Sequence, residues 1–201
     1  MKLLILILIS LNLTSQVKYD TIISNSIYKS YFNYELKQPV LLTYKLYKGG
    51  GDCKRDTFRF INDSKIKTLT NKNYKNSGYD KGHLASAEDF AYNCSLDELT
   101  FRFYNCVPQT HELNRGVWKK EEFYVRNLSQ FDSLIVICYN TYKSKKINNM
   151  IIPDTCYKFV YSLRNKKFVV AFYATNTNQP IYKSITNSVL IKKYNWLFNY
   201  L

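Results

Sequence analysis

The sequence predicts a single-domain α+β fold, because strand-like segments lie before and after one helical segment. Tyr and Phe number 19 and 12, whereas Gly and Pro number only 6 and 4, and this composition favours strands over a helical bundle. The length of 201 residues suits one hydrophobic core. No repeat, Pro/Ser-rich linker or block of like charge divides the sequence. We therefore expect one folded unit.

Apolar alternation and turn residues place the individual elements. Residues 39–47 predict a strand that ends at the glycines 49–51, and the polar stretch 52–79 predicts a long, partly ordered loop. Residues 99–105 alternate between apolar and polar side chains and predict another strand. The remaining elements are a helix over 112–129, strands at 134–139, 158–163 and 168–173, a turn at 164–166 and a short closing helix within 188–201.

The first residues predict a secretory signal peptide over residues 1–15. Lys2 precedes an unbroken apolar run over 3–9, which is too short to cross a bilayer as a stable span. The alternative is an uncleaved first strand that is buried. We expect a secreted or periplasmic protein whose mature domain, residues 16–201, has no membrane span.

Five cysteines fit an oxidising destination, and their odd number leaves at least one outside any intramolecular pair. Their connectivity stays open, although Cys138 lies in an apolar run and fits a core position. The 29 Lys and Arg exceed the 15 Asp and Glu, which gives a net charge of +14. Such a surplus attracts polyanions, nucleic acid first and anionic membranes or acidic glycans second.

The first chemical motif is Asp80-Lys81-Gly82-His83. A His beside a Gly fits a general base on a tight turn, where a nearby carboxylate or carbonyl can orient the imidazole. Because the sequence has only two His, the pool of bases is small. Taken alone, the motif also fits a structural His.

Two further motifs contribute amide, carboxylate and guanidinium groups. They are residues 105–109, Asn-Cys-Val-Pro-Gln, and residues 114–118, Asn-Arg-Gly-Val-Trp, which precede Glu122 and Arg126 on the expected helix. Oxygen ligands hold Mg²⁺ with most of its waters retained, and a guanidinium binds phosphate oxygens in a fork. The alternative is a surface helix with an ordinary Glu–Arg pair four residues apart.

Taken together and in order, these motifs resemble the DNA/RNA non-specific endonucleases of the ββα-metal (His-Me finger) class. That family has Asp-Arg-Gly-His, then Asn-x-x-Pro-Gln, then Asn-x-Gly-x-Trp followed by Glu and Arg. Residues 152–160 and 171–176 also resemble two of its strands, so the resemblance covers about residues 40–176. It implies a ββα-metal core within a mostly antiparallel sheet packed with helices.

The resemblance implies roles for the residues around the expected cation. His83 matches the general base that activates the attacking water, and Asn114 matches the single direct metal ligand. Glu122 matches the acid that holds a metal-bound water. On a regular α-helix that includes Asn114, Glu121 would lie about 20° and Glu122 about 80° from the direction of Asn114. Gly116 favours a later start of the regular helix, and the family spacing favours Glu122.

The resemblance also implies residues that contact or orient the phosphate. Asn105 matches an Asn that helps to place His83 and the substrate, and Arg126 matches an Arg near the phosphate. Arg55 matches an Arg that stabilises the transition state, with Arg59 as the competing choice. Lys81 replaces the Arg of the family motif, which keeps the charge but loses the bidentate fork.

We therefore expect a Mg²⁺-dependent endonuclease, with Mn²⁺ or another divalent cation as the alternative, that acts on DNA, RNA or both through the phosphate backbone. One alternative is a secreted nucleic-acid-binding protein with weakened catalysis. Another is a nuclease toxin. The sequence leaves the oligomeric state open.

Overall fold

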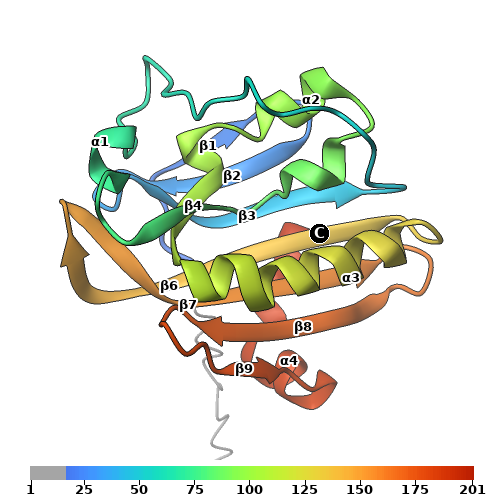
Figure 1. Cartoon of the computed structure of the whole chain (residues 1–201). Coiled ribbons are helices and arrows are strands. Elements are labelled where there is room, and N and C mark those ends of the chain that lie inside the picture. Colours follow the sequence, from blue (N-terminus) through green and yellow to red (C-terminus); the bar gives the residue numbers. More distant parts are fainter. Residues whose placement is uncertain (1–16) are drawn as a thin grey trace, which may run out of the picture.

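The computed structural model describes residues 17–201, so the expected signal peptide lies outside the described residues. At the centre is a seven-stranded sheet in the order β1-β2-β3-β6-β7-β8-β9, and every neighbouring pair is antiparallel (Figure 1). The strands are β1 Thr21–Ser24, β2 Tyr28–Asn33, β3 Gln38–Leu46, β6 Leu134–Ile147, β7 Met150–Ser162, β8 Lys167–Thr175 and β9 Tyr182–Ser184. This sheet contains the strands predicted at 39–47, 134–139, 158–163 and 168–173, which confirms them.

Two short strands and a helix form a separate unit on one face of the sheet. Strands β4, Tyr79–His83, and β5, Cys106–Thr110, pair only with each other. A π-helical turn, Leu113–Trp118, then continues into α3, Lys119–Ser129, which confirms the helix predicted at 112–129. In Figure 1, α3 lies across the part of the sheet formed by β6, β7 and β8.

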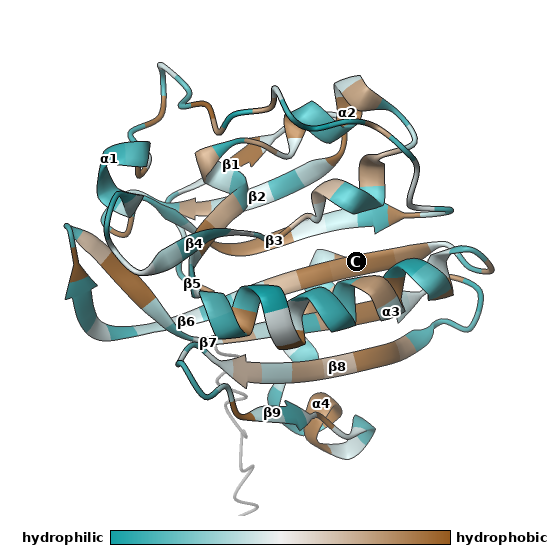
Figure 2. Cartoon of the chain, viewed as in Figure 1, coloured by the Kyte–Doolittle hydropathy of each residue, from teal (hydrophilic) through white to brown (hydrophobic). Residues whose placement is uncertain are grey.

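The main core lies between this unit and the sheet. Trp118 and Val125 point from the helical segment into a cluster with Val136, Val160 and Phe172 of the sheet, and the rings of Trp118 and Phe172 are 5.8 Å apart. The same strands are predominantly hydrophobic, whereas hydrophilic residues recur along α3 (Figure 2). Burial of this apolar surface fixes the unit on the sheet.

The opposite face of the sheet is covered by the C-terminal segment. The short helix α4, Asn187–Lys193, and a 3₁₀ segment, Asn195–Tyr200, bring Leu190, Trp196 and Leu197 against Phe159 and its neighbours. This confirms the predicted closing helix. Across residues 17–201, no helix is long and apolar enough to span a membrane.

The strand predicted at residues 99–105 is wrong. The short helix α2, Cys94–Leu99, occupies its start, because the side chain of Asn93 accepts hydrogen bonds from the first free backbone amides of that helix. A 3₁₀ turn, Phe103–Asn105, follows. Phe103 and Tyr104 are both buried, but in different clusters, so consecutive apolar side chains enter two separate cores. The alternating pattern is therefore produced by tertiary packing and does not mark a strand.

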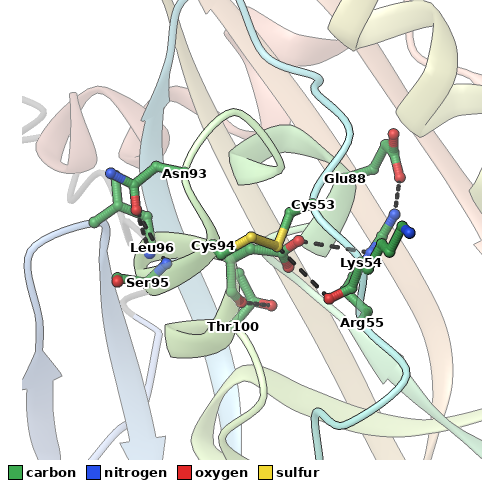
Figure 3. Close-up of a disulfide and its surroundings, with 10 residues drawn as sticks. Cys53, Lys54, Arg55, Glu88, Asn93, Cys94, Ser95, Leu96 and Thr100 are labelled. Atoms are coloured by element: carbon green, nitrogen blue, oxygen red, sulfur yellow. Dashed lines mark hydrogen bonds and ion pairs between the residues drawn. A yellow bond between two sulfur atoms is a disulfide. The ribbon is translucent and has the colours of Figure 1, made fainter.

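One disulfide joins Cys53 to Cys94, 41 residues later, and connects the long loop after β3 to the start of α2 (Figure 3). Cys106, Cys138 and Cys156 are free and buried. Cys138 lies in the main core, which confirms the position expected for it.

The disulfide should contribute substantially to stability, because a crosslink over 41 residues restricts the unfolded chain. We expect the variant C53S/C94S to lose about 2–4 kcal/mol of unfolding free energy, measured by urea titration. Dithiothreitol should destabilise the original protein by a similar amount and leave the variant unaffected. Equal stabilities of the variant and the oxidised protein would contradict this expectation.

Candidate active site

His83 is the last residue of β4, opposite Cys106 of β5. The tight turn predicted around it is wrong, since Gly82 lies within the strand. Gly82 is required there for another reason. A Cβ atom at this position would lie 2.1 Å from Oε1 of Gln109, whose side chain crosses the backbone of β4. The Gly therefore allows the β4–β5 pair to close next to His83.

Asp80 of β4 connects this hairpin to the π-helical turn. Its carboxylate accepts hydrogen bonds from Asn114 Nδ2 at 3.0 Å and from Arg115 Nε and Nη2 at 2.9 and 2.8 Å. His111 Nδ1 lies 3.0 Å from the same carboxylate. Burial opposes ionisation of Asp80, but these hydrogen bonds outweigh it and lower its pKa. Asp80 thus orients groups on the turn, and no hydrogen bond joins it to His83 among residues 17–201.

Asn114 fits a cation through the orientation of its amide. Because Nδ2 donates to Asp80, the carbonyl oxygen Oδ1 is turned away from that carboxylate, and the structure gives this oxygen no hydrogen bond within the described residues. A neutral carbonyl oxygen is a suitable ligand for Mg²⁺, which retains most of its waters. No group of three His, Cys, Asp or Glu that could hold a metal occurs among residues 17–201. The donor set therefore fits a hard cation held by one amide oxygen and water.

The π-helical turn decides which Glu shares the face of Asn114. A π-helix has about 4.4 residues per turn, or about 82° per residue, so four such steps followed by four α-helical steps bring Glu122 to within about 10° of Asn114. Glu121 then lies about 90° away and faces the pocket that Tyr124 and Tyr182 also line. The structure therefore favours Glu122 over Glu121 on geometry, and its role stays a prediction.

His83 is enclosed by aromatic rings. The rings of Phe60 and Phe101 lie 4.9 and 5.0 Å from the imidazole, and Nε2 is buried without a hydrogen-bond partner among residues 17–201. Water therefore has to reach the ring at Nδ1. Burial is the main reason that the pKa of His83 falls from 6.5 to about 4, and the positive charges of Arg55 and Lys81 act in the same direction. The imidazole is consequently neutral at physiological pH, as a proton acceptor must be.

Arg55 and Lys81 are the two cations whose charges act on the imidazole of His83. Lys81 lies two residues before His83 on the same face of β4, and its Nζ donates to Asn71 Oδ1 at 2.9 Å, above the ring of Phe60. Arg55 comes from the loop that the disulfide holds (Figure 3). The guanidinium of Arg59 instead donates to backbone carbonyls of its own loop. Of the two candidate arginines, Arg55 is therefore the one whose charge acts on His83.

Two acidic residues hold Arg55 in place. Its Nη2 pairs with Glu88, and its Nε lies 3.6 Å from Asp97 Oδ2. Burial raises the pKa of Asp97 to about 6, while Arg55 opposes this rise. Neither acid could be identified from the sequence, because both belong to short helical segments without a recognisable motif.

Two predicted site residues point into the protein. Asn105 is fully buried, and its side chain exchanges hydrogen bonds at 2.9 Å with the backbone of Ala85, two residues after His83. It can therefore place the end of β4, whereas its burial keeps it from substrate. Arg126 donates to Asp89 Oδ1 at 2.9 Å and to Ser86 Oγ at 3.3 Å beneath α3.

Lys158 is a buried residue for which the sequence predicted no role. It lies on β7 next to Glu122, and the two side chains are 3.8 Å apart. A signal was available, since Lys158 occupies an inward position between Cys156 and Val160 on an alternating strand. A Lys at such a position needs an acidic partner.

Comparisons with known proteins identify the family and the fold of this chain. A model of the DNA/RNA non-specific endonuclease family matches residues 11–198. In the crystal structure of the EndoG/EndoGI complex, one chain superposes with a TM-score of 0.75 at 22% identity, over 89% of this chain and 85% of that chain. At this identity the likeness shows the fold, and it confirms the predicted α+β architecture.

Relatives share shorter stretches of sequence. Mitochondrial endonuclease G of Bos taurus is 32% identical over 44% of this chain and 30% of its own length. Mitochondrial nuclease EXOG of Xenopus laevis is 36% identical over 44% of this chain and 25% of its own length, and a nuclease of Nostoc is 33% identical over 47% and 36%. The matches thus span about a quarter to a third of these relatives. Since the family model covers nearly the whole sequence, the chain belongs to the DNA/RNA non-specific endonuclease family.

Proposed function

We propose that this protein is a Mg²⁺-dependent endonuclease that hydrolyses phosphodiester bonds in DNA and RNA. The observation that supports this most directly is the arrangement around β4. Asp80 directs the amide of Asn114 so that its carbonyl oxygen is free, and the same strand ends at His83, a neutral imidazole. A general base and an oxygen ligand are therefore fixed to one hairpin–helix unit.

In the proposed reaction, His83 accepts a proton at Nδ1 from the water that attacks phosphorus. Asn114 would hold the cation through Oδ1, and Glu122 would hold it through water. When bound, the cation supplies positive charge where negative charge accumulates on the phosphate and the leaving oxygen. Arg55 adds a guanidinium beside His83, and Glu88 and Asp97 keep it there. Phe60 and Phe101 exclude water from one side of the imidazole.

Substrate binding is supported by a row of side chains on one face of β4. Tyr79, Lys81 and His83 alternate along this face, about 6.7 Å apart. Lys145, in the hairpin of β6 and β7, extends the row, since its Nζ lies 5.5 Å from the centre of the Tyr79 ring. The two ammonium groups of this row, those of Lys145 and Lys81, lead towards His83 and suit binding of the phosphate backbone without reading of the bases.

We also propose that the protein is secreted or periplasmic. The apolar run at residues 3–9 and the disulfide between Cys53 and Cys94 support this proposal, because structural disulfides persist in oxidising compartments. The alternative function, nucleic-acid binding with weakened catalysis, predicts no metal-dependent cleavage, so a cleavage assay with and without EDTA distinguishes the two functions.

Cleavage of plasmid and of RNA should require a divalent cation and His83. We expect His83→Ala to lower kcat by about 10²–10⁴-fold with little change in nucleic-acid affinity, because it removes only the proton acceptor. His111→Ala is the matched control and should cost much less, since His111 contacts Asp80 and not the reacting water. Full activity in EDTA, or equal losses for the two variants, would contradict the proposed function.

The pH dependence should show the low pKa of His83. As pH falls, kcat/KM should stay level through pH 6.5 and decline only near pH 4, where the half-buried imidazole takes up a proton. The free energy of unfolding should also decrease as pH falls. The unfolded chain binds this proton first, so the stabilisation by neutral His83 is present above pH 6.5 and is lost as pH falls towards 4. An acid limb of kcat/KM at pH 6.5 would contradict the lowered pKa of His83.

Lys145 should bind one phosphate. We expect Lys145→Met to weaken binding of a short duplex in EDTA and to reduce the slope of log K against log salt by about 1, with kcat unchanged at saturating substrate. Lys192→Met is the control, because Lys192 is an exposed residue of α4, on the opposite face of the sheet. Identical slopes for both variants would remove Lys145 from the binding surface.

A further inference from the structure

Lys158 is a charged residue in the centre of the main core. Its side chain has no exposed surface, and Nζ has no hydrogen-bond partner among residues 17–201. The ammonium lies 4.4 Å from the centre of the Trp118 ring and 3.8 Å from Glu122 Oε1. A buried ammonium without a counterion is strongly destabilising, and Glu122 is the acidic residue that pairs with it.

The other charged groups beneath α3 already have partners. Asp89 accepts hydrogen bonds from Arg126 Nε at 2.9 Å and from the hydroxyl of Tyr44 at 2.8 Å. Arg126 and Asp89 thus form one compensated pair, and Glu122 and Lys158 form the second. Lys158 is the only basic side chain within 4 Å of the Glu122 carboxylate among the described residues.

The contacts of Lys158 connect it to the strand that carries His83 and to the helical face that carries Asn114 and Glu122. Trp118, whose ring the ammonium faces, donates through Nε1 to the backbone oxygen of His83 at 3.2 Å. Glu122 lies on the helical face that Asn114 also occupies. Lys158 attracts Oε1 of Glu122 from 3.8 Å, and the Glu122 side chain keeps 15% of its surface exposed, through which the carboxylate can reach a further partner.

We propose that Lys158 is a positioning residue, whose ammonium holds the Glu122 carboxylate in the orientation that binds the cation's water. This inference rests on the proposed function, since it assigns Lys158 an effect on cation binding through Glu122. A purely structural Lys158 would affect stability without that coupling.

The test is a double-mutant cycle on Mn²⁺ affinity, measured by electron paramagnetic resonance of free Mn²⁺ without nucleic acid. The variants are Lys158→Met, Glu122→Gln and the double variant, and Lys167→Met at an exposed position is the control. We expect K158M to raise the Kd for Mn²⁺ by about 10-fold, as loss of an outer partner of a metal ligand commonly does. In the E122Q background the same change should alter Kd less than 2-fold.

Two results would overturn the inference: an unchanged Mn²⁺ affinity in K158M, or an equal loss of affinity in the E122Q background. Circular dichroism establishes that each variant is folded. Absence of Mn²⁺ binding by the unmutated protein would instead contradict the proposed function itself, and the inference with it.

A second measurement needs only the folded, unmutated protein. The ¹⁵Nζ resonance of Lys158, assigned by its loss in Lys158→Gln, should shift when Mg²⁺ is added and should not shift in E122Q. A resonance that does not respond to Mg²⁺ in the unmutated protein would overturn the inference even if K158M fails to fold.

Discussion

The site depends on the hydrogen bonds that the carboxylate of Asp80 accepts. This carboxylate accepts them from Asn114 and Arg115 and so joins β4 to the π-helical turn that begins the helical segment. An amide nitrogen cannot bind a cation, and Asp80 binds that nitrogen, which leaves the oxygen of Asn114 available. The strand that orients the expected ligand is also the strand that ends at the expected base. The carboxylate of Asp80 thereby fixes the position of the expected ligand, Asn114, relative to the expected base, His83.

Charge compensation governs the rest of the site. Two ion pairs lie beneath α3, and a third group of charges holds Arg55 between Glu88 and Asp97. Each buried charge is costly unless it is paired, so the side chains have little freedom to reorient. The disulfide at Cys53 acts on the same loop, two residues before Arg55. His83 is the exception, since aromatic packing and neighbouring cations keep it neutral.

The sequence was sufficient for the strands β3, β6, β7 and β8 and for the helix α3, because apolar alternation is a local feature. The ββα unit followed only from the family resemblance of the three motifs. The sequence was insufficient where distant residues decide the structure. Residues 99–105 alternate like a strand, yet Asn93 starts a helix before them and two separate cores take up their aromatic rings. The choice between Glu121 and Glu122 depended on a π-helical turn that has no sequence signature. The pairing of Cys53 with Cys94, and the roles of Glu88 and Asp97, arise only from packing.

We propose that Asp80 fixes Asn114 so that its carbonyl oxygen is the direct protein ligand of the cation. Anomalous diffraction from crystals soaked in Mn²⁺ tests this claim most directly. We expect one strong anomalous peak in contact with Asn114 Oδ1, with Nδ2 still bonded to Asp80. A Mn²⁺ ion bound directly to the carboxylate of Asp80, with the amide of Asn114 turned away, would contradict the claim.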